Sequence, residues 1–250
     1  MCWFRRNDKL YRYEAGLVRA HFPKLKYYVR GEKLLILKGE IDLIHDSKLL
    51  DTYQVEILFL EDYPFSHPVA REISNRIPWI MDRHVDSKYG LFCLGPRVHV
   101  QQFWEQHRTI LDFINGLVVP FLANQSFFER MGEWPNGWYA HGTPGILEFY
   151  KEEMGGSDIS LIIDVLERLI ANEDLGRNDK CFCGSLLKAK RCHFDNYKRL
   201  KGVLNKSVFK LDIDNLQKYQ KDSRNITKEI LGQDKDEIND DSNDKESANL

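Results

Sequence analysis

The run YQVEILFL, residues 53–60, is the segment that decides the fold. Its apolar residues Tyr53, Val55, Ile57 and Phe59 recur at every second position, so they share one face of a β-strand and can cover a core. Three further segments have the composition of strands, at residues 27–29, 34–43 and 69–73. A glycine at position 31 suits a hairpin turn between the first two of these segments. The sequence therefore predicts four strands in its first third.

Helical segments surround the strands. Apolar periodicity predicts helices at residues 9–22, 105–122 and 159–171, and a short one at 208–219. Pro23 is expected to end the first helix, and Pro120 to end or bend the second. Ser157 or Asp158 is expected to cap the third. Residues 74–103 and 131–146 lack periodicity, so we expect two long ordered loops, which are usually functional.

Composition narrows the class of protein. The chain has 250 residues, of which 42% are hydrophobic, and a formal net charge of -2. The hydrophobic fraction supports a buried core, and the small net charge disfavours a general binder of nucleic acid. No apolar run is judged long enough for a membrane span, and residues 1–6 lack the pattern of a secretory signal. We therefore expect a cytoplasmic protein whose five cysteines are reduced.

One isolated cysteine, Cys93, lies inside the first long loop, in the stretch Gly90-Leu91-Phe92-Cys93-Leu94. A turn at Gly90 can present its sulfur to solvent, as nucleophilic catalysis by a thiol requires. The stretch 82–86, which contains His84 and Asp86, comes shortly before it. The competing interpretation is a small buried apolar residue, because free cysteines are often buried in the core.

The order of these features resembles the core of ubiquitin-conjugating enzymes, in particular their divergent bacterial relatives. The features are a strand, the turn 63–68 (YPFSHP), the histidine stretch, G-x-x-C-L and then Trp104. The resemblance covers roughly residues 10–150 and includes the later stretch 138–142 (WYAHG). It implies an α+β fold, with an N-terminal helix, a four-stranded antiparallel meander and C-terminal helices.

The resemblance also implies roles for single residues. Cys93 carries an acyl group as a thioester, and Trp104 covers one side of it and excludes water. His84 stands where these enzymes have a mainly structural histidine, one residue short of the usual distance. Asp86 replaces their asparagine, and because an ionised carboxylate cannot donate to an oxyanion, it is expected to orient or deprotonate the amine, or simply to form a turn. Oxyanion donation then falls to backbone amides, His99 or His107.

Partners follow from the same resemblance. The donor is a protein C-terminus, either of a ubiquitin-like protein or of a cyclic-oligonucleotide synthase, and the context is bacterial defence against phage. The sequence contains neither a G-x-G-x-x-G element nor a P-loop, so a separate adenylating enzyme is expected to activate that C-terminus. Two other functions remain open. One is a non-catalytic adaptor with the same fold, and the other is a hydrolase of conjugates that uses a cysteine–histidine pair.

A second group of cysteines has the spacing of a metal site. Cys181, Cys183, Cys192 and His193 form the pattern C-x-C-x8-C-H, which supplies three thiolates and one imidazole for a structural zinc ion. The run 176–185 and the ligand spacing resemble the SEC-C motif, which usually has Gly-Lys at positions 186–187, where this chain has two leucines. The alternatives are a redox thiol cluster or a segment that binds no metal at all.

These observations predict the following organisation: a conjugating domain at 1–152, a connecting helix at 153–175, a zinc module at 176–206, a short helix at 207–220 and a disordered acidic tail at 221–250. Residues 176–206 contain nine Lys or Arg against two Asp or Glu. We expect this basic module to dock on a protein, with nucleic acid as the less favoured partner and no membrane partner.

Overall fold

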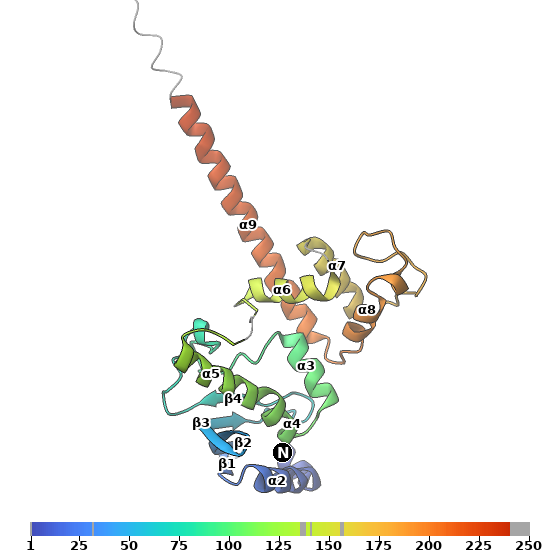
Figure 1. The fold of residues 1–250 in the computed structure, drawn as a ribbon. Coiled ribbons are helices and arrows are strands. Elements are labelled where there is room, and N and C mark those ends of the chain that lie inside the picture. The colour runs from blue at the N-terminus through green and yellow to red at the C-terminus, as the bar shows by residue number, and fades with distance from the viewer. Residues whose placement is uncertain (1, 32, 136–138, 141, 156–157, 241–250) are drawn as a thin grey trace, which may run out of the picture. The chain divides into compact units, whose positions relative to one another are not determined.

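The computed structural model describes residues 2–31, 33–135, 139–140, 142–155 and 158–240 (Figure 1). The chain forms two compact units. The first comprises Met1–Gly145 with Gly202–Asn205, and the second comprises Ile146–Lys201 with Lys206–Leu250. The division therefore falls at Gly145 instead of residue 152, and the zinc module shares its unit with neighbouring helices.

The first unit contains one four-stranded antiparallel sheet in the order β1-β2-β3-β4, so the predicted α+β class is confirmed. Its strands are β1 (Leu25–Arg30), β2 (Leu34–His45), β3 (Lys48–Leu58) and β4 (Val69–Glu72). The second and third are longer than predicted because a two-residue turn joins them directly. Asp46 and Ser47 in this turn both have positive φ, as a tight hairpin between twisted strands requires.

One face of the sheet forms the core of the first unit. Tyr53, Val55 and Ile57 are buried on β3, as their alternation predicts, and β2 contributes Leu37 and Ile41 to the same core. Helix α2 (Asp8–His21) follows the short α1 (Trp3–Arg6). Its buried Glu14 accepts hydrogen bonds from Tyr63 Oη at 2.8 Å and from the N–H of Ile110 at 2.8 Å. This carboxylate therefore joins three segments that are distant in the sequence.

The helical region after Cys93 differs from the prediction of one helix at 105–122. It consists of α3 (Arg97–Gln106), α4 (Ile110–Phe113), a π turn (Ile114–Val118) and α5 (Val119–Met131). Helix α3 thus begins inside the predicted loop 74–103, as does the 3-10 turn η1 (Met81–Arg83). Pro120 does not end the helical stretch as expected: it lies in the first turn of α5, directly after the π turn Ile114–Val118, and the helix continues to Met131.

The stretch Ile110–Met131 is long and apolar enough to cross a membrane by length and composition, contrary to the prediction that no such run exists. Its side chains Ile110, Phe113, Val118 and Leu122 are buried in the core of the first unit. These buried positions are part of the core that packs against the sheet.

The second unit is helical outside its Cys/His segment. It contains α6 (Thr143–Met154), α7 (Ile159–Ile170), η3 (Ala189–Arg191), α8 (Phe194–Lys201) and α9 (Ser207–Asp240). Asp158 caps α7 by accepting the N–H of Ser160, and the apolar face of α7 packs against α9. Ser157, the other predicted cap, lies outside the described residues.

Helix α9 continues to Asp240, so the prediction of a short helix that ends at residue 220 was wrong. Residues 221–240 are rich in Lys, Asp and Glu and contain no proline, and a composition that cannot form a core can still form a helix. The predicted disorder of 241–250 concerns residues that are not described.

Candidate functional sites

Cys93 lies at the end of a short hairpin formed by residues 84–93. Val85 and Phe92 form an isolated antiparallel bridge, and the N–H of Asp86 donates to the carbonyl of Leu91 at 2.9 Å. The N–H of Cys93 donates to the carbonyl of His84 at 2.8 Å. The predicted loop is therefore an ordered structure that fixes the backbone of the cysteine against that of the histidine.

Several contacts anchor this hairpin to the rest of the first unit, among them a hydrogen bond from the N–H of Phe92 to the carbonyl of Ala70 on β4 at 2.8 Å. Phe92 is buried and stacks on Phe121 of α5, with ring centroids 4.2 Å apart. Gly90 has a φ of +69°, and a Cβ at this position would lie 2.3 Å from the Trp79 ring. The turn therefore requires glycine. Leu94, a predicted anchor, is partly buried against the same core.

Cys93 is exposed at the surface, but other sides of its thiol lie against protein atoms. This desolvation raises the pKa of the Cys93 thiol above its ordinary value of 9.0. A hydrogen bond from the N–H of Gly95 and the positive charge of Arg97 act in the opposite direction. The thiol is accessible and close to two groups that favour an anion, while its desolvation opposes ionisation.

His84 and Asp86 both have structural partners, His84 outside the hairpin and Asp86 within it. His84 is buried with a left-handed backbone, and its ring lies edge-on to Trp134, with centroids 5.3 Å apart. The Asp86 carboxylate accepts the backbone N–H groups of Lys88 at 3.2 Å and Tyr89 at 2.7 Å. These contacts make Asp86 a turn residue and His84 a buried residue packed on an aromatic ring. A catalytic role of either side chain stays a prediction.

Three other residues with expected roles occupy different places. Trp104 is fully buried and donates from Nε1 to the carbonyl of Pro64 at 3.0 Å, so it is a core residue of the YPFSHP turn and not an exposed cover. His99 is exposed on α3, and the ring of His107 lies on Phe103, with centroids 4.7 Å apart. Of the stretch 138–142, Trp138 and His141 lie outside the described residues.

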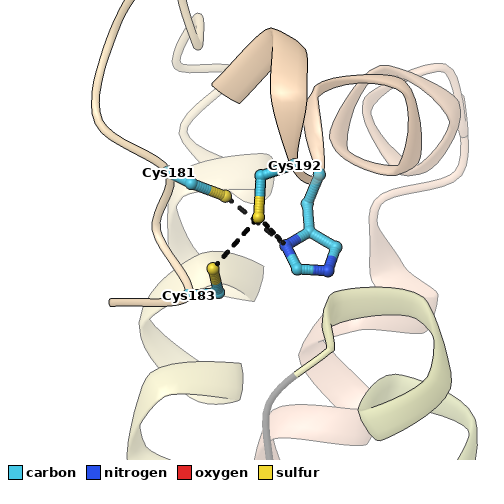
Figure 2. Close-up of side chains that lie close together, drawn as sticks. Cys181, Cys183 and Cys192 are labelled. Atoms are coloured by element: carbon cyan, nitrogen blue, oxygen red, sulfur yellow. Dashed lines mark hydrogen bonds between the residues drawn. The ribbon is translucent and has the colours of Figure 1, made fainter. Parts of the chain in front are cut away.

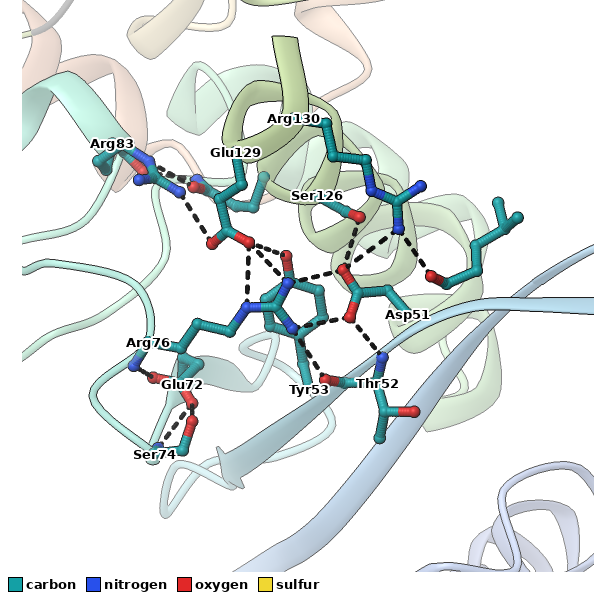
Figure 3. Close-up of polar contacts among 12 residues, drawn as sticks. Asp51, Thr52, Tyr53, Glu72, Ser74, Arg76, Arg83, Ser126, Glu129 and Arg130 are labelled. Carbon is teal, nitrogen blue, oxygen red and sulfur yellow. Dashed lines mark hydrogen bonds and ion pairs between the residues drawn. The ribbon is translucent and has the colours of Figure 1, made fainter. Parts of the chain in front are cut away.

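A polar network that the sequence did not indicate holds the start of the hairpin. Arg83 Nε donates to Gln125 Oε1 at 2.9 Å, and Gln125 Nε2 donates back to the Arg83 carbonyl at 2.7 Å. Glu129 pairs with both Arg83 and Arg76, and Arg76 makes two hydrogen bonds to Asp51 (Figure 3). No local sequence pattern predicts a contact between residues 83 and 125. The only signal in the sequence was that Arg83 directly precedes the candidate residue His84.

The Cys/His segment brings its four predicted ligands together in the second unit (Figure 2). The sulfur atoms of Cys181, Cys183 and Cys192 and a ring nitrogen of His193 all lie within 4.8 Å of one another. The sulfurs of Cys183 and Cys192 are 3.4 Å apart, and Nδ1 of His193 is 3.4 Å from Cys181 Sγ and 3.1 Å from Cys192 Sγ. An antiparallel bridge between Lys180 and Lys188 closes the loop that carries the first two cysteines.

This geometry fits a tetrahedral metal ion. Zinc–sulfur bonds of about 2.3 Å place the thiolates of a tetrahedron about 3.8 Å apart, close to the 3.4 Å between the sulfurs of Cys183 and Cys192. Burial raises the pKa of Cys181 to about 11. Burial also acts to raise the pKa of Cys183. Hydrogen bonds with Ser185 outweigh this effect and lower the pKa of Cys183 to about 6. These thiols would lose their remaining protons when they bind a metal.

Comparison with known protein families agrees with this site. Residues 177–195 match the SEC-C motif. The SEC-C match contains all four clustered residues, including the segment in which Leu186 and Leu187 depart from the usual pattern. It covers this part of the second unit only. Neither the curated proteins nor the solved structures gave a significant match to the chain.

Proposed function

We propose that the first unit is an acyl carrier of the ubiquitin-conjugating type, which holds a protein C-terminus as a thioester on Cys93 and transfers it to an amine. The observation that carries the proposal is the exposed Cys93 at the end of the 84–93 hairpin. The helix, four-stranded meander and proline turn that precede it have the order expected for this class.

The chemistry needs a thiolate and a group that stabilises an oxyanion. In loading, the Cys93 sulfur bonds to the acyl carbon of the donor C-terminus, the bond from that carbon to the thiol of the activating enzyme breaks, and the proton of Cys93 passes to this leaving thiol. In transfer, the amine forms a C–N bond to the acyl carbon and loses a proton, the C–S bond breaks, and the Cys93 sulfur takes up a proton. The N–H of Gly95 and the charge of Arg97 are the candidates for stabilising negative charge near the sulfur.

Activation of the donor is assigned to a partner. Because the sequence lacks a phosphate-binding loop motif, a separate adenylating enzyme would form the energy-rich bond. The donor is a ubiquitin-like protein or a cyclic-oligonucleotide synthase, and the proposed context is defence against phage. Since desolvation raises the pKa of the Cys93 thiol, loading also calls for a partner that lowers this pKa or accepts the proton.

The SEC-C segment is assigned a structural zinc ion, held by Cys181, Cys183, Cys192 and His193. Four protein ligands leave no open coordination position, so this zinc would stabilise the fold and take no part in catalysis. The surplus of lysine and arginine around it suits docking on a protein partner.

The test is to incubate the protein with candidate donor and activating proteins and to look for a covalent adduct. We expect an adduct that thiols cleave, which becomes a thiol-resistant ester in Cys93→Ser. Cys2→Ser is the matched control, because Cys2 is the other cysteine outside the metal cluster, and it should leave the adduct unchanged.

Two alternative functions predict different results. The adaptor has support from the raised pKa of Cys93 and from the use of Asp86 in a turn, and it predicts binding of the donor without an adduct. A hydrolase predicts release of the carrier from an existing conjugate, abolished by Cys93→Ser. Either result would overturn the acyl-carrier proposal.

A further inference from the structure

The backbone at the end of α6 lies against the imidazole of His193. A Cβ at Gly155 would lie 2.3 Å from Nε2 and 2.6 Å from Cε1 of this ring. Gly155 has a left-handed φ of +62°, and its N–H donates to the carbonyl of Lys151 at 2.9 Å, so it ends the helix. There is no room for a side chain at position 155 while the ring keeps its place.

The orientation of the ring follows from contacts on both of its edges. Nδ1 faces the sulfurs of Cys181 and Cys192, and Nε2 faces Gly155. The ring of Phe182 lies beside it, with centroids 5.7 Å apart. Because the two nitrogens belong to one rigid ring, a backbone wall at Nε2 determines where Nδ1 points.

The wall itself is fixed to the helix that follows His193. The side-chain amide of Asn196 donates to the carbonyl of Glu153 at 2.5 Å, and the Glu153 carboxylate pairs with Arg199. Both partners lie on α8, and Glu153 lies in the last turn of α6. The end of α6 is therefore held next to the cluster independently of Gly155.

We propose that Gly155 is a positioning residue for the metal site. Its lack of a side chain lets the end of α6 support His193 so that Nδ1, and not Nε2, is the metal ligand. Metal binding in turn fixes α6 to the Cys/His segment, which makes the segment part of a larger helical unit. This inference rests on the metal site proposed above.

The test compares Gly155→Ala with Gly132→Ala in the full-length protein. Gly132 ends α5 with a φ of +75°, and a Cβ there would meet nothing within 4 Å, so the control has the same backbone cost without the contact. Zinc affinity is measured by competition with a chromophoric chelator, and cobalt spectra report the ligand set. Gly155→Ala should weaken zinc binding about tenfold or more, as loss of an outer-shell support does, while Gly132→Ala stays within about twofold.

The same pair is then measured in a His193→Cys background. A fourth cysteine keeps a tetrahedral ligand set but removes the ring, so Gly155→Ala should now cost no more affinity than Gly132→Ala. This background also keeps the test decisive if Gly155→Ala alone fails to fold. Equal zinc affinities of Gly155→Ala and Gly132→Ala would overturn the role of Gly155 but not the metal site. A loss of affinity that persists in the His193→Cys background would do the same. A wild-type protein that binds no zinc would overturn the metal site as well.

Discussion

Asp86 has a structural role in a turn and, in the proposed reaction, a candidate second role as a base for the amine. Its carboxylate receives two backbone N–H groups, from Lys88 and Tyr89, and so fixes the turn that precedes Cys93. An aspartate that only accepts hydrogen bonds from a turn can be replaced by asparagine, because the amide oxygen is also an acceptor. A carboxylate that deprotonates an amine cannot be replaced in this way.

We therefore expect Asp86→Asn to retain both stability and transfer from Cys93, whereas Asp86→Ala loses about 0.5–1.5 kcal/mol of unfolding free energy because two exposed hydrogen bonds of the turn are lost. Denaturant unfolding and the adduct assay measure the two effects. Asp82→Ala, an exposed carboxylate in the same segment, is the control. If Asp86→Asn folds normally but no longer transfers the acyl group, Asp86 has an acid–base role.

At the scale of elements, the contact between η1 and α5 determines where the hairpin begins. Gln125 is fully buried and bonds both the side chain and the carbonyl of Arg83, and the next carbonyl, that of His84, receives the N–H of Cys93. Helix α5 thus helps to position the cysteine: Gln125 fixes Arg83 through two hydrogen bonds, and the neighbouring His84 carbonyl holds the backbone of Cys93.

Gln125→Leu should destabilise the first unit by about 1–3 kcal/mol, because it leaves the Arg83 guanidinium and carbonyl without their buried partner. The variant should also change the rate at which Cys93 reacts with a thiol reagent, measured by peptide mass spectrometry. Gln54→Leu makes the same replacement at an exposed site on β3 and should affect neither quantity. Unchanged stability and thiol reactivity in Gln125→Leu would contradict this role.

At the scale of the whole molecule, the chain combines two units with different sources of stability. The first has a sheet with a large apolar core, and the second has helices joined to a small segment whose polar loop holds four potential metal ligands. A segment of this size buries little apolar surface, so metal ligation is expected to supply much of its folding free energy.

Purified protein should contain about one zinc per chain, and Cys181→Ser combined with Cys192→Ser should abolish it. Chelation should raise hydrogen exchange in peptides from residues 176–201 and leave peptides from the β-sheet unchanged. The double variant Cys2→Ser with Cys93→Ser is the control and should keep its zinc. Full zinc content in the Cys181/Cys192 variant would exclude these residues as the metal site.

The sequence by itself determined the features that depend on near neighbours along the chain. Alternation at Tyr53, Val55 and Ile57 predicted a buried strand face, and the spacing of Cys181, Cys183, Cys192 and His193 predicted a ligand cluster, because each pattern follows from local backbone geometry. Helix ends were less predictable, as the region around Pro120 and the extension of α9 demonstrate.

Only the tertiary structure decided the features that depend on approach between distant segments. It buried Trp104 beneath the proline turn, desolvated the Cys93 thiol, paired Arg83 with Gln125 and placed Gly155 against His193. Burial, pKa and steric room are properties of the surroundings in space, and residues separated by tens of positions supply those surroundings. For that reason no local pattern in the sequence contains them.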